Sequence, residues 1–141
     1  MLLVGLRAVG AAMLVLAALY PIYPRRFRWA EQLQRVELLT RQVFWVHIGF
    51  IVLLLVLQSV LLVGFPRVLL APDGAATALL VGMLVFWLYR LVAQLFVYDS
   101  ALWRNDPTHL LVHVLFTALW IAISAVLGWA LVVQLTVVPD T

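Results

Sequence analysis

Four long apolar segments constrain the fold of this chain more than any other feature of its sequence. They cover residues 2–20, 43–64, 75–97 and 108–135. Each is long enough to cross the hydrocarbon core of a bilayer, which takes about 20 helical residues. Because lipid offers no hydrogen-bond partner to an exposed backbone amide, an isolated strand is excluded there and a helix is favoured. The sequence therefore predicts four transmembrane helices.

Helix-breaking residues separate these segments. Pro21 follows the first segment, and Pro66 follows the second. Asp106 and Pro107 precede the fourth, where aspartate suits the N-cap and proline suits the first helical position. With no linker to divide the chain, we expect one all-α domain over residues 1–141, folded as a polytopic four-helix bundle.

Composition excludes several classes of protein. Only 11% of the residues are charged, against about 25% in an ordinary soluble domain. All nine basic residues are arginines, and most of them flank the apolar segments. We interpret them as membrane anchors and expect the bilayer, not nucleic acid, as the partner. The absence of cysteine excludes disulfides and thiolate metal sites.

The arginines also predict the orientation, because cytoplasmic loops carry the excess of positive charge. If the segment between the first two helices is cytoplasmic, seven arginines lie inside: Arg25, Arg26, Arg28, Arg35, Arg41, Arg90 and Arg104. Only Arg7 and Arg67 then lie outside. We therefore predict that both termini are non-cytoplasmic, and we expect the membrane to be a bacterial inner membrane.

The segment 25–42 has an amphipathic pattern. Apolar residues occur in it at helical spacing: Trp29, Leu33 and Val36. This pattern predicts an amphipathic helix at the cytoplasmic interface, or an extension of the second transmembrane helix. A surface ion pair between Glu37 and Arg41 is the simpler interpretation of its charges, and a surface for a partner or an anionic lipid is the alternative.

Polar side chains inside the apolar segments are costly in lipid and mark candidate functional positions. His47 lies near the start of the second segment. A stripe at helical spacing follows the third: Met83, Trp87, Arg90, Gln94 and Tyr98. A similar stripe follows the fourth: His109, His113, Thr117, Trp120 and Ser124. We expect these polar faces to turn toward one another inside the bundle.

Neighbouring helices alternate in direction, so the costly residues fall in one layer on the cytoplasmic side. We predict a cofactor or ligand site formed by His47, Arg90, Gln94 and His113, with Asp99 just below. The imidazoles of His47, His109 and His113 could hold a transition metal, or two helices could each ligate a b-type haem through one histidine. The simpler interpretation is that the histidines bond backbone carbonyls and Arg90 reaches the headgroups.

Enzyme signatures are absent from the sequence. It contains no glycine-rich phosphate loop, no GxSxG and no HExxH, so we predict no catalytic residue. Three functions remain: a structural or accessory subunit of an oligomeric or multi-subunit membrane complex, a metal- or haem-binding redox protein, and a small oligomeric transporter or channel. The first is favoured because so little of the chain lies outside the apolar segments, while small and aromatic residues are available for helix contacts.

Overall fold

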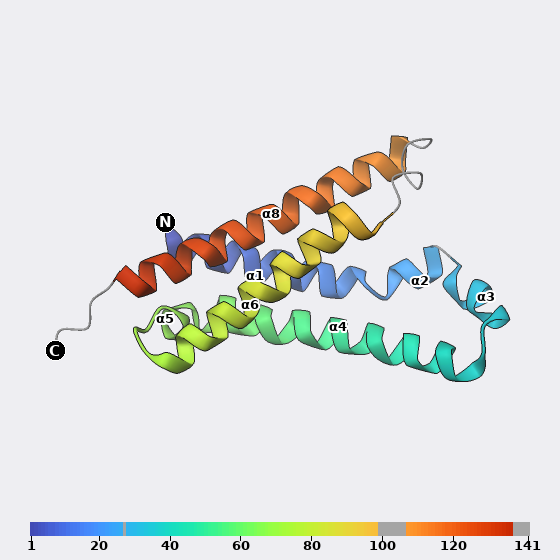
Figure 1. Ribbon diagram of the computed structural model, residues 1–141, viewed down its shortest axis with the longest axis horizontal. Helices are drawn as coiled ribbons and strands as arrows, with labels where there is room; N and C mark the ends of the chain where they lie inside the picture. The colour runs from blue at the N-terminus through green and yellow to red at the C-terminus, as the bar shows by residue number, and fades with distance from the viewer. Residues whose placement is uncertain (27, 99–106, 137–141) are drawn as a thin grey trace. The chain divides into compact units, whose positions relative to one another are not determined.

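The computed structural model describes residues 1–26, 28–98 and 107–136 (Figure 1). All secondary structure in these residues is helical. Four helices are long and apolar enough to cross a membrane: α1 (Leu2–Leu19), α4 (Leu38–Gly64), α6 (Gly74–Val92) with its continuation η2 (Ala93–Val97), and α8 (Pro107–Thr136). The predicted all-α class and the four long apolar helices are therefore confirmed.

The helix ends differ only slightly from the predicted ones. α1 ends one residue before the predicted position, and α8 is one residue longer at each end. Pro107 is the first residue of α8 as predicted, whereas Asp106 lies outside the described residues. The largest difference is at α4, which begins at Leu38 instead of residue 43. The second transmembrane helix thus includes part of the amphipathic segment.

The rest of that segment forms short turns instead of one continuous helix. They are α2 (Ile22–Arg26), α3 (Trp29–Gln32) and the 3₁₀ turn η1 (Leu33–Arg35). Arg28 has a φ of 53°, in the left-handed region, so helical geometry is interrupted between α2 and α3. Val36 is extended and interrupts it again before α4. Trp29 contacts Phe44 of α4 edge to face, with ring centroids 5.5 Å apart.

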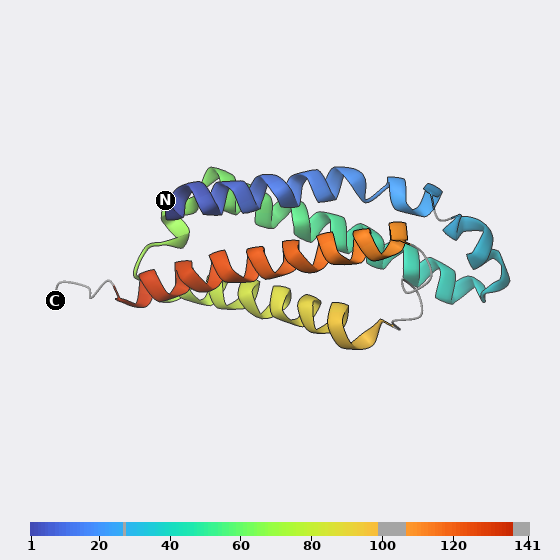
Figure 2. The same cartoon turned by 90° about the horizontal axis from the view of Figure 1, so that it is seen from above.

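The chain divides into two compact units, one of Met1–Leu6 with Pro66–Thr141 and one of Arg7–Phe65. In the first unit, α6 and α8 pack side by side (Figures 1 and 2). The single transmembrane domain over residues 1–141 stays a prediction. Both units have buried apolar residues in their long helices.

In the second unit, α1 and α4 approach closely at Gly10. A Cβ atom at Gly10 would lie 2.8 Å from both Leu62 Cβ and Val63 Cγ2, and 3.2 Å from the backbone nitrogen of Val63. No side chain fits at these distances. Glycine is therefore the residue that lets the two helices come together here.

In the first unit, two polar side chains fix the connection between α4 and α6, which includes the short helix α5 (Pro66–Leu69). Asp73 caps α6, because its Oδ1 atom accepts hydrogen bonds of 2.9 Å from the backbone N–H groups of Ala75 and Ala76. Gln134, buried near the end of α8, donates from Nε2 to the carbonyls of Leu69 at 3.1 Å and Ala71 at 2.6 Å. The end of α8 is thereby attached to this connection.

Candidate functional site between α6 and α8

An aromatic stack joins α6 to α8. The rings of Trp87 and Trp120 lie 5.0 Å apart at an angle of 28°. Phe116, one turn before Trp120 on α8, stacks against its ring at 5.5 Å and 22°. Both tryptophans are buried, so the stacked rings form a packed aromatic surface between the two helices.

Arg90 lies against this aromatic surface. Its Cζ atom is 5.1 Å from the centroid of the Trp120 ring and 5.6 Å from that of Tyr98. Both distances allow a cation–π interaction, which is strongest with tryptophan. Arg90 Nη1 also donates a hydrogen bond of 3.1 Å to Gln94 Oε1, one turn later in the chain. The guanidinium is therefore held in one orientation although the residue is only half-buried.

Gln94 connects Arg90 to α8 through a second hydrogen bond. Its Nε2 atom lies 2.8 Å from Nδ1 of His113. Since Oε1 of the amide accepts from Arg90, Nε2 is the donor, and His113 accepts through Nδ1 and carries its proton on Nε2. Gln94 is buried and sits in the π-helical turn η2, a feature often found at functional sites.

The charge of Arg90 has only neutral partners in the part of the chain that the structure describes. These partners are the amide of Gln94 and the ring faces of Trp120 and Tyr98. An ion pair in the described residues, Arg28 with Glu31, lies in the other unit. Asp99, the carboxylate that the sequence places just below this layer, lies outside the described residues.

Two further donors are buried at this interface without a partner among the described residues, Trp120 Nε1 and Ser124 Oγ. Other hydroxyl groups on the long helices bond to the carbonyl one turn earlier. Ser59 donates to Leu55 at 2.7 Å, and Thr117 donates to His113 at 2.8 Å. Ser124 lacks this bond, so its hydroxyl is desolvated without compensation.

We therefore expect Ser124→Ala to raise the free energy of unfolding by about 1 kcal/mol, because the substitution removes an unpaired buried hydroxyl. The matched control is Ser59→Ala, which removes a hydroxyl that is also buried but is hydrogen-bonded. This substitution should lower the stability by up to about 1 kcal/mol. Denaturation of both variants in mixed detergent micelles measures the difference. Equal effects of the two substitutions would contradict the conclusion that the Ser124 hydroxyl is buried without a hydrogen-bond partner.

The structure thus brings together three of the four residues predicted to form the ligand site: Arg90, Gln94 and His113. His47 is exposed in the other unit, and its Nδ1 atom lies 2.8 Å from the carbonyl of Val43 on its own helix. This contact agrees with the simpler interpretation of a histidine near a helix end. The convergence of His47 with Arg90 and His113 stays a prediction.

The metal site of His47, His109 and His113 also stays a prediction. His109 is exposed, one turn before His113 on α8. Among the described residues, no group of three or more histidine, aspartate or glutamate side chains is arranged to hold a metal ion. A histidine that binds a metal through Nε2 usually donates from Nδ1, whereas His113 accepts there from Gln94.

No protein-family model, curated protein or solved structure matches the chain. What the site can do therefore follows from its own residues. Arg90 offers guanidinium N–H groups to an anion, and the amide of Gln94 with the ring of Trp120 fixes the direction in which they point. The cluster is suited to hold a carboxylate or another small anionic group.

Proposed function

We propose that this chain is a non-catalytic accessory subunit of a membrane complex and that Arg90 pairs with a carboxylate of another subunit. The observation that carries the proposal is the charge of Arg90, which has only neutral partners within the described residues. An arginine costs about 2.5–3.5 kcal/mol at the centre of a transmembrane helix, and Arg90, about two turns before the end of η2, bears a smaller part of that cost. A carboxylate on a neighbouring helix offsets this cost better than an amide can.

The geometry of Arg90 supports such a pair. In the part of the chain that the structure describes, the guanidinium donates one hydrogen bond, to Gln94, and the residue is half-buried. A guanidinium has five N–H donors and binds a carboxylate through two parallel hydrogen bonds. Because Gln94 and Trp120 already hold the group in place, pairing requires little further ordering of the side chain.

The distribution of acidic residues favours a different subunit over a second copy. All six acidic residues of the chain lie outside the apolar segments: Glu31, Glu37, Asp73, Asp99, Asp106 and Asp140. A second copy therefore offers no carboxylate within a span. We infer that the complex contains at least one other protein with an aspartate or glutamate in a transmembrane helix.

The test is retention of the complex after extraction in a mild detergent. We expect Arg90→Gln to reduce the fraction of assembled chain by about tenfold or more at equal expression, because glutamine keeps polarity but leaves the partner carboxylate without its opposite charge. The matched control is Arg67→Gln. It removes an exposed arginine of α5, in the connection that precedes α6, and should leave assembly unchanged. Equal assembly of the Arg90 and Arg67 variants would contradict the proposal.

We also propose that both termini face away from the cytoplasm, in a bacterial inner membrane. The support is the arginine distribution, with seven on one side and two on the other. A reporter that is active only outside the cytoplasm should therefore be active when fused after Thr141, and a cytoplasmic reporter should be inactive there. The opposite pattern of reporter activity would overturn this orientation.

No observation favours a channel or transporter, or a metal- or haem-binding redox protein, over an accessory subunit of a membrane complex. A channel or transporter would use Arg90 to bind an anion, and a haem or metal protein would use His113. The hydrogen bond from Gln94 occupies Nδ1 of His113 and is explained by packing alone. Assembly accounts for the charge of Arg90 directly, and for this reason we favour it.

A further inference from the structure

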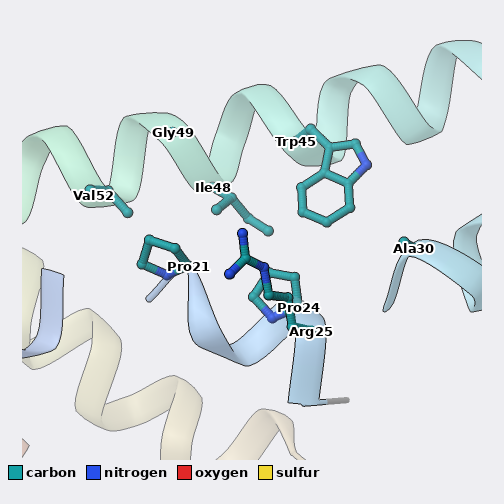
Figure 3. A pocket seen from close by; sticks show the side chains of 8 residues that line it. All are labelled: Pro21, Pro24, Arg25, Ala30, Trp45, Ile48, Gly49 and Val52. Atoms are coloured by element: carbon teal, nitrogen blue, oxygen red, sulfur yellow. The ribbon is translucent and has the colours of Figure 1, made fainter. Parts of the chain in front are cut away.

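A groove separates the N-terminal part of α4 from the turn that follows α1, within the unit Arg7–Phe65 (Figure 3). It encloses about 500 Å³. One wall is a face of α4 formed by Trp45, Ile48, Gly49 and Val52. The other wall contains two prolines and Arg25, whose guanidinium points toward α4.

The charge in this groove is concentrated at one point. Arg25 is the charged residue of the lining, and the rest of the surface is apolar. Arg25 and Arg26 end α2, and neither forms an ion pair with a carboxylate of the described residues. The groove therefore combines a cationic group with apolar walls.

The position of the groove along α4 fits the boundary between headgroups and acyl chains. Trp45 and Val52 lie about two and four turns after Leu38, the first residue of the helix. Tryptophan is enriched at this boundary in membrane proteins. Arg25 comes from the polar connection that follows α1, so it approaches the groove from the side on which headgroups are expected.

We propose that this groove binds one anionic phospholipid, with the phosphate at Arg25 and an acyl chain along Ile48, Gly49 and Val52. Gly49 provides the space, because a Cβ atom built there would meet no atom within 4 Å. The guanidinium supplies the N–H donors that a phosphate diester accepts. A polybasic segment beside a transmembrane helix is the usual setting for anionic lipid recognition.

A lipid fits this groove better than a helix of a partner protein. Its volume lies within the range of small-molecule sites, about 300–1,000 Å³. A helix with its side chains is about 10–12 Å across and needs a long apolar stripe, whereas this groove follows only two turns of α4. A segment of one acyl chain fits along two turns of helix, about 11 Å, and Arg25 explains a preference for an anionic headgroup.

The first test is a titration of the delipidated protein with phosphatidylglycerol and with phosphatidylcholine, followed by native mass spectrometry. We expect tighter binding of phosphatidylglycerol. Arg25→Gln should weaken that binding about fivefold, the effect of about one surface arginine, and leave phosphatidylcholine unchanged. The matched control is Arg26→Gln, which changes the neighbouring charge outside the groove. Equal binding of the two lipids, or equal effects of the two substitutions, would overturn the proposal.

The second test fills the groove. Gly49→Leu should reduce the binding of both lipids, because its side chain occupies the acyl path. Gly64→Leu is the control, since Gly64 lies on the same helix, also has open space around it and does not line the groove. Should Gly49→Leu fail to fold by circular dichroism, Gly49→Ala should give a smaller reduction. Unchanged lipid binding in the Gly49 variants would overturn the proposal. If these variants instead lose a co-purified protein, the groove binds that protein and not a lipid.

Discussion

Replacing Gly10 with alanine is expected to lower the free energy of unfolding by about 1–3 kcal/mol, the usual range for overpacking. The new Cβ atom would lie 2.8 Å from Leu62 Cβ and Val63 Cγ2. The first is attached to the backbone, and the backbone nitrogen of Val63 is only 3.2 Å away. Neither can be avoided by rotating a long side chain, so α1 and α4 must move apart. Detergent denaturation of the purified variant measures the loss.

The control for this prediction is Gly82→Ala on α6. A Cβ atom at Gly82 would meet no atom within 4 Å, and alanine is the better helix former by about 1 kcal/mol. Gly82→Ala should therefore be neutral or stabilising. If the Gly10 and Gly82 variants unfold at the same denaturant concentration, the close approach of α1 and α4 is wrong.

Replacing Gln134 with leucine is expected to lower the free energy of unfolding by about 1–3 kcal/mol. The substitution removes both hydrogen bonds from the Gln134 amide to the carbonyls of Leu69 and Ala71, each worth about 0.5–1.5 kcal/mol. Leucine has a similar volume, so packing should change little. The loss should appear both in denaturation and in faster proteolysis of the connection between α4 and α6, which the amide holds against α8.

A control for Gln134→Leu exists two residues later. Thr136 Oγ1 donates a hydrogen bond of 2.9 Å to the carbonyl of Val133, in its own helix and at an exposed position. Thr136→Val removes this local bond and should change stability by less than about 0.5 kcal/mol. A cleavage rate that is the same in both variants would show that Gln134 does not hold the connection.

The long helices could be predicted from the sequence because two independent signals agree. Apolar segments set their length, and proline or glycine set their ends within one or two residues in three cases. The apolar pattern predicts the start of α4 five residues too late, because Arg41 and Gln42 interrupt it although a helix at a membrane edge tolerates polar residues. The break at Arg28 depends on a left-handed backbone conformation, which an arginine does not predict.

Part of the candidate site could also be predicted. Arg90, Gln94 and His113 stood out because polar groups are costly in an apolar helix, and helical spacing placed the first two on one face. The direction of the hydrogen bonds, the π-helical turn and the unpaired Ser124 hydroxyl could not be predicted, because they depend on how α6 and α8 are rotated against each other. Phe116 gave no signal, since a phenylalanine in an apolar segment is ordinary.

The prediction for His47 rests on depth alone. Its position near one end of a helix predicts the layer in which it lies, but not the direction in which its side chain points around the helix axis. The structure shows it exposed and bonded to its own helix. Gly10 illustrates the converse case, because its role follows from a distance to α4 and not from polarity. A neighbouring run of small residues, Ala11 and Ala12, is the one signal that could have identified it.

The most direct test of the proposed function is the mass of the particle that contains this chain when native membrane is extracted with a polymer that retains its lipid. We expect the 15.9 kDa chain together with at least one different protein in a fixed ratio, and that protein should have an aspartate or glutamate within a transmembrane helix. A particle that contains the 15.9 kDa chain as its sole protein, in one copy or several, would contradict the pairing of Arg90 with another subunit.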